Sequence, residues 1–182
     1  MFNQRIILLL IVVAFIVSDN ATSQVYLTKE ETLKLYFPQS SIERKTLFLT
    51  DEQLQKIQSI AKAKLDSKIL TYYVANGAKG IDGYAFFETH IVRTMPETFI
   101  AVLDQNGIIR AVEILAFYEP EDYLPSKRWL ALFGQKNLND NLWVKRGIPN
   151  ISGATLSTHA ITEGVRRILA TFSIAIPKET QP

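Results

Sequence analysis

Apolar residues at helical spacing predict a long helix near the C-terminal end of the chain. Five of them recur at positions i, i+4, i+7, i+8 and i+11, namely Ile161, Val165, Ile168, Leu169 and Phe172. The charged residues Glu163, Arg166 and Arg167 lie off this stripe, and Pro177 begins a polar tail. We therefore expect a helix that packs through one apolar face and ends before Pro177.

Two shorter helices are expected near the other end of the chain. The motif Thr28-x-x-Glu31 is typical of a capping box, and the helix that it opens should end before Pro38. A second capping box is predicted at Thr50-x-x-Gln53. The segment between these helices, Gln39–Lys45, is polar, and we expect it to form a surface loop.

The middle of the chain is rich in β-forming residues. It favours strands over Lys68–Ala75, Tyr84–Val92, Phe99–Leu103 and Ile108–Phe117. The dipeptide Asn106-Gly107 separates the last two runs and indicates a hairpin, because both residues tolerate a positive φ.

The order of these elements predicts the fold class. Tyr118–Lys145 has no clear period, and we expect a partly helical excursion there, with its helical part at Arg128–Phe133. Helices at both ends of a run of strands favour an α+β fold with a mainly antiparallel sheet. The expected parts are a leader (1–23), a helical segment with the first strand (24–76), a second domain (77–177) and a tail (178–182).

The first 23 residues have the pattern of a secretory signal peptide. Arg5 provides the positive charge, Ile6–Val17 is an unbroken apolar run, and Ala21-Thr22-Ser23 is a small-x-small cleavage pattern before Gln24. The apolar run is short for a membrane span. Export to the periplasm, or to the outer face of the cytoplasmic membrane, is the first prediction, and an uncleaved membrane anchor is the alternative.

Composition excludes several classes of function. The chain of 182 residues has no cysteine, so it lacks disulfides, thiol catalysis and cysteine-ligated metal clusters. The net charge is +2 without a dense basic stripe, which argues against a nucleic-acid partner. The two histidines, His90 and His159, do not have the spacing of a metal site. We accordingly expect no metal ligand.

The run Ser152-Gly153-Ala154-Thr155 is the strongest candidate for chemistry. Small residues let a phosphate approach the backbone, and the helix that follows offers free N–H groups and a favourable dipole. The alternative is an ordinary loop and helix cap, for which Ser and Thr are also favoured. Ser157 and Thr158 are fallback acceptors, with helix capping or phosphate binding as their more ordinary roles.

This run resembles the attachment motif of the FMN-binding domain family, which includes flavin subunits of the Rnf complex and of the sodium-pumping NADH:quinone oxidoreductase. The segment Thr98–Phe117 (TFIAVLDQNGIIRAVEILAF) also looks like the strand-turn-strand of that family. The resemblance implies that Thr155 carries FMN through its phosphate and that Glu119 and Pro120 lie near the flavin ring. A plain turn at Glu119-Pro120 is the alternative. Pro149 departs from the family, which often has an acidic residue there.

The function implied by this resemblance is electron transfer at the cell envelope. A separate flavin transferase that uses FAD and Mg²⁺ would attach the FMN, so the carrier needs no catalytic base of its own. A redox protein or a membrane electron-transfer complex would be its partner. The competing hypothesis is an exported binding or structural module that has the same fold and no flavin, which the proline at position 149 favours.

Overall fold

The computed structural model describes residues 24–177, so the predicted leader and tail lie outside the described residues. Its centre is a six-stranded sheet in the order β1-β6-β5-β4-β3-β2, and every neighbouring pair is antiparallel. The strands are β1 (Gln24–Val25), β2 (Ser41–Phe48), β3 (Ile69–Gly77), β4 (Gly80–Ile91), β5 (Pro96–Asp104) and β6 (Ile109–Phe117). Both expected segments, 24–76 and 77–177, contribute strands to this one sheet.

The helices confirm the expected α+β class. They are α2 (Lys29–Tyr36), α3 (Asp51–Ala61), α4 (Lys127–Leu130) and α5 (Thr155–Ala175), with short 3-10 turns η1 (Glu121–Tyr123) and η2 (Ala131–Phe133). A small parallel pair, β7 (Trp143–Val144) and β8 (Gly147–Ile148), lies between η2 and α5. Both predicted capping boxes are present, at Thr28 with Glu31 and at Thr50 with Gln53.

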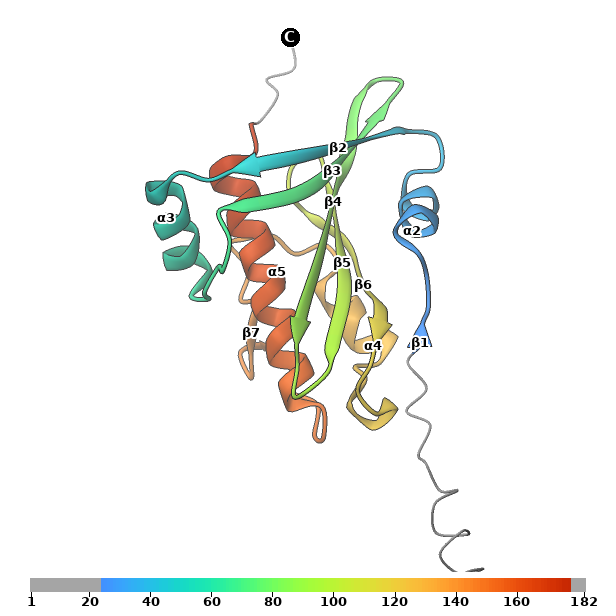
Figure 1. Cartoon of the computed structure of the whole chain (residues 1–182), viewed down its shortest axis with the longest axis vertical. Helices are drawn as coiled ribbons and strands as arrows, with labels where there is room; N and C mark the ends of the chain where they lie inside the picture. The colour runs from blue at the N-terminus through green and yellow to red at the C-terminus, as the bar shows by residue number, and fades with distance from the viewer. Residues whose placement is uncertain (1–23, 178–182) are drawn as a thin grey trace, which may run out of the picture.

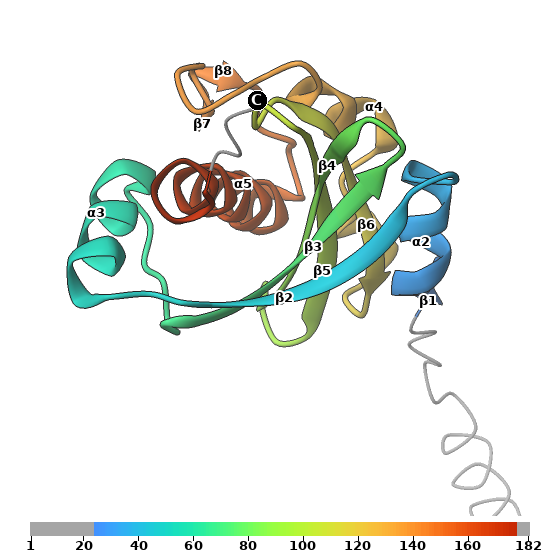
Figure 2. The same ribbon diagram turned by 90° about the horizontal axis from the view of Figure 1, so that it is seen from above.

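Two helices cover opposite faces of the sheet, as Figures 1 and 2 show. The predicted apolar stripe of α5 is buried against one face, together with Phe99, Ala101 and Leu103 of β5. Ile100 and Val102 of the same strand face the other side and pack with residues of α2. Because alternate residues of a strand point to opposite faces, β5 is buried on both and has an unbroken apolar run.

Helix α3 packs beside α5 rather than on the sheet (Figure 2). Arg166 of α5, which lies off the apolar stripe, is 7% exposed and connects the two helices. Its Nε donates to the carbonyl of Ala61 at 2.7 Å, and its guanidinium lies 3.6 Å from the ring centre of Trp143. The arginine therefore satisfies a carbonyl at the end of α3 that the helix itself leaves without a partner.

The predicted hairpin between β5 and β6 is confirmed, but its turn differs from the expected one. Gly107 has φ +84°, whereas Asn106 does not adopt a positive φ. The amide of Gly107 donates to the Asp104 carbonyl at 3.1 Å, and the amide of Asp104 donates to the Ile108 carbonyl at 2.8 Å. Only the glycine needs the left-handed conformation, as in three-residue hairpin loops.

The prediction of a surface loop at Gln39–Lys45 was wrong, because β2 begins at Ser41 and pairs with β3 along its length. The strand lies at the edge of the sheet and is mostly exposed, so its sequence lacks an apolar face.

Strands β3 and β4 are paired over only part of their length. Residues Tyr73 to Gly77 of β3 pair with β4, whereas the part of β3 before Tyr73 diverges from β4 (Figure 1).

Candidate functional site

The predicted acceptor run forms the entry to α5. Ala154 is the N-cap residue, Thr155 is the first residue of the helix, and no side chain caps the helix. The chain reaches this point through a turn in which the amide of Ala154 donates to the carbonyl of Ile151 at 3.2 Å. Gly153 has φ +89°, and the nearest atom to a Cβ built there is 3.9 Å away. The glycine thus makes the turn and leaves open space beside the helix N-terminus.

The hydroxyl groups near this end of α5 differ in accessibility. Thr155 is exposed, receives a hydrogen bond from Asn150 Nδ2 at 3.1 Å and lies 3.5 Å from the carbonyl of Ile151. Ser157 is 1% exposed and donates to the carbonyl of Tyr123 at 2.9 Å. Thr158 is fully buried and bonds to Asn150 Oδ1 at 2.9 Å. Neither Ser157 nor Thr158 caps the helix, so the prediction of a capping role was wrong, whereas phosphate binding by these residues stays a prediction.

A cavity of about 300 Å³ lies directly beside Thr155. Its walls are residues Gly153 to Ser157 on one side and Val92, Arg93 and Tyr123 on the other. The guanidinium of Arg93 lies 4.6 Å from the ring centre of Tyr123. A cation and the uncapped start of a helix of 21 residues therefore border the same space, and both attract anions.

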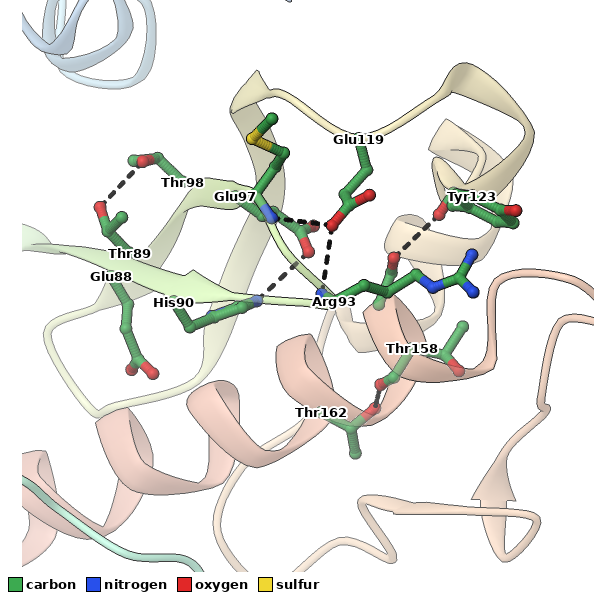
Figure 3. Close-up of polar contacts among 12 residues, drawn as sticks. Glu88, Thr89, His90, Arg93, Glu97, Thr98, Glu119, Tyr123, Thr158 and Thr162 are labelled. Carbon is green, nitrogen blue, oxygen red and sulfur yellow. Dashed lines mark hydrogen bonds and ion pairs between the residues drawn. The ribbon is translucent and has the colours of Figure 1, made fainter.

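Glu119 holds the turn that presents Arg93 (Figure 3). Its Oε1 accepts from the backbone amides of Arg93, Thr94 and Met95 at 3.2, 2.7 and 2.9 Å. These bonds, chiefly that from Thr94, lower the pKa of the carboxyl, because they favour its charged form. Glu119 does not line the cavity. Glu119 thus stabilises a turn, which was one of the two roles that the sequence left open for it.

Pro120 begins the short turn η1 that carries Tyr123 to the cavity, through a bond from the Tyr123 amide to the Pro120 carbonyl at 2.9 Å. Trp129 is 5% exposed in the main core, and its Nε1 donates to the carbonyl of Pro149 at 2.7 Å. Trp129 therefore fixes the start of the acceptor loop.

Sequence reasoning missed a buried acidic residue close to this site. Glu97 of β5 is fully buried, and its Oε2 lies 3.2 Å from Nε2 of His90 (Figure 3). Its Oε1 and the Nδ1 of His90 have no hydrogen-bond partner among the described residues. Burial raises the pKa of Glu97, and the bond from His90 opposes this only in part. The available sequence clue was its position, two residues before Phe99 and so on the same face of β5.

Asn150 was also missed, although it stands only five residues before Thr155. Its Nδ2 donates a hydrogen bond to Oγ1 of Thr155, and its Oδ1 accepts one from Oγ1 of Thr158. This arrangement fixes the orientation of the loop relative to the first turn of α5.

No family model, no curated protein and no solved structure matches the chain. Among the described residues, no helix has the length and apolar character needed to cross a membrane. The same part of the chain has no cluster of three or more His, Asp or Glu side chains that would suit a metal ion.

Proposed function

We propose that this protein is an exported electron carrier with FMN attached by a phosphoester to Thr155. The observation that carries the proposal is the exposed hydroxyl of Thr155 at the uncapped start of α5, beside a cavity bordered by Arg93. The resemblance of Ser152-Gly153-Ala154-Thr155 to the attachment motif of the FMN-binding domain family supports the same residue.

The residues at the site suit the phosphate end of FMN. The amides at the start of α5 provide hydrogen-bond donors, and the helix dipole favours a negative charge. Arg93 adds a positive charge that is held in place by Tyr123 on one side and by the Glu119 turn on the other. When bound, the flavin supplies the redox chemistry, and the protein supplies its position and surroundings.

The surface around the cavity also suits a partly exposed ring. Leu156 lines the cavity and is 51% exposed, and Met95, which follows Arg93 by two residues, is 45% exposed. Large apolar side chains with this exposure offer contact area to an aromatic ring.

Attachment has a simple chemical balance. Oγ1 of Thr155 would form a bond to the phosphorus of the FMN half of FAD, while the pyrophosphate bond would break and AMP would leave. A base of the transferase would take the hydroxyl proton, and Mg²⁺ bound with the FAD would balance the charge of the phosphates. No described side chain is placed to act as a general base toward the Thr155 hydroxyl. Its hydrogen-bond partners are the side-chain amide of Asn150 and the carbonyl of Ile151.

The test is covalent loading of single variants. The chain is co-expressed with a flavin transferase in the presence of FAD and Mg²⁺, and its intact mass is measured. The wild type should gain the mass of one FMN less one water. Thr155→Val, which keeps the shape of the side chain, should gain nothing.

Ser173→Ala is the matched control, because Ser173 is also an exposed hydroxyl of α5 and lies outside the acceptor run. It should load like the wild type. Loading of Thr155→Val would move the acceptor to another residue. A wild type that stays unmodified beside an active transferase would overturn the carrier hypothesis and favour the module without flavin.

A further inference from the structure

The splayed strands β3 and β4 leave an open strand edge inside the molecule. β4 pairs with β3 only up to Ala85, whereas residues 86–91 of β4 pair with β5 alone. Alternate residues of this stretch therefore direct their N–H and C=O groups away from β5. At about 3.4 Å per residue, six residues present an edge about 20 Å long.

A cavity of about 830 Å³ runs along this edge. Its other walls come from α5, at residues such as Ala160 and Ile168, and from the segment Lys64–Ser67 that connects α3 to β3. A strand edge recessed between a helix and a loop is shielded from flat edge-to-edge pairing, yet it is open to a single extended chain. This cavity is separate from the one beside Thr155, whose lining residues are different.

The charged groups along the cavity differ in how they are paired. Lys64 pairs with Asp66 at 2.8 Å, and Arg167 pairs with Glu88. Glu163 also lines the cavity and is half-buried. It interacts with the charge of Arg166 on the same helix, and that guanidinium donates to the carbonyl groups of Ala61, Lys62 and Leu142. The buried Nδ1 of His90 is a polar atom in this wall without a hydrogen-bond partner among the described residues.

From these observations we infer that the cavity binds an extended peptide segment of another protein, which adds a strand to the free edge of β4 and places a Lys or Arg side chain against Glu163. The main-chain bonds to residues 86–91 give affinity, and the carboxylate of Glu163 gives a preference for a basic side chain. A second protein chain satisfies a row of alternating donors and acceptors, which a compact small molecule does not. This inference does not depend on the flavin.

The test uses three synthetic heptapeptides of alternating Val and Thr, which differ only in a central Lys, Gln or Glu. The protein as isolated is titrated with each one to millimolar concentration, and its amide NMR shifts and hydrogen exchange are recorded. The Lys peptide should slow exchange at residues 86–91 and bind about tenfold more tightly than the Glu peptide.

Two variants separate the charge from the edge. Glu163→Gln should abolish the preference for Lys over Glu, while peptides still protect the β4 edge. Glu52→Gln, an exposed glutamate of α3, is the matched control and should keep the preference. The inference is overturned if no peptide protects residues 86–91 or if the Lys preference survives Glu163→Gln. It is also overturned if the edge is protected without peptide in proportion to protein concentration, which would mean that a second copy occupies it.

Discussion

Replacing Gly107 with alanine should destabilise the fold for two reasons that the structure separates. Gly107 has φ +84°, a conformation that costs a residue with a side chain about 1–2 kcal/mol. A Cβ at this position would also lie 2.5 Å from Cε1 and 2.6 Å from Cδ1 of Phe172, on the buried stripe of α5. Overpacking of this kind costs about 1–3 kcal/mol.

The two effects add to about 2–5 kcal/mol, a large share of the ~5–15 kcal/mol that stabilises a typical domain. For a chain of this size, each kcal/mol lowers the melting temperature by about 2–4 °C, so the expected decrease is about 4–20 °C. Urea unfolding, followed by circular dichroism, gives the change in free energy, and a thermal scan gives the change in temperature.

Two further variants make this reasoning refutable. Gln105→Ala, in the same turn, should change the free energy of unfolding by less than about 0.5 kcal/mol. Gly107→Asn should recover about 1 kcal/mol relative to Gly107→Ala, because asparagine tolerates a positive φ while its Cβ still meets Phe172. Equal urea midpoints for Gly107→Ala and Gln105→Ala would show that neither the backbone cost nor the overpacking cost exists. If Gly107→Asn recovers no stability relative to Gly107→Ala, the positive φ makes no contribution.

Two more predictions concern the buried and bonded carboxyl groups. Glu119→Ala leaves three turn amides to the solvent and should cost about 0.5–1.5 kcal/mol. The pKa of Glu119 is lowered in the folded state, so its contribution to stability is present above the ordinary value of 4.5 and is lost as the pH falls through the folded pKa. The free energies of unfolding of the wild type and of Glu119→Gln, measured in urea, should therefore converge at low pH. The pKa of Glu97 is raised instead, so its contribution is present below 4.5 and is lost as the pH rises through the folded pKa. Glu97→Gln should therefore gain stability relative to the wild type between pH 4.5 and 7, and a constant difference across this range would contradict the assignment.

Features with local causes could be predicted from the sequence. The two capping boxes depend on residues three positions apart, and the stripe of α5 depends on its own periodicity, so each appears where the pattern placed it. Strand β2 could not be found in this way. It is an exposed edge strand held by its pairing with β3, and pairing leaves no apolar pattern in the sequence.

The candidate site shows the same division. Thr155 and the loop before it are consecutive residues, and their place at the start of α5 follows from the predicted helix. Arg93 reaches the cavity from the connection between β4 and β5, through bonds to a residue 26 positions later in the chain. Glu97 meets His90 through the register of β4 and β5, which depends on the whole hairpin. Contacts of this kind need the sheet to be assembled first.

The surroundings of Thr155 indicate what the chain contributes to its own modification and what it lacks. A hydroxyl becomes a nucleophile when a base removes its proton. Thr155 contacts the amide of Asn150 and the carbonyl of Ile151, and neither group takes up a proton at neutral pH. Pro149 adds no base, and its carbonyl already accepts from Trp129. The chain thus holds an exposed hydroxyl beside groups that attract a phosphate. If Thr155 carries FMN as we propose, the base would have to come from the transferase. Loading would then require that enzyme, and it would be a property of the pair of proteins.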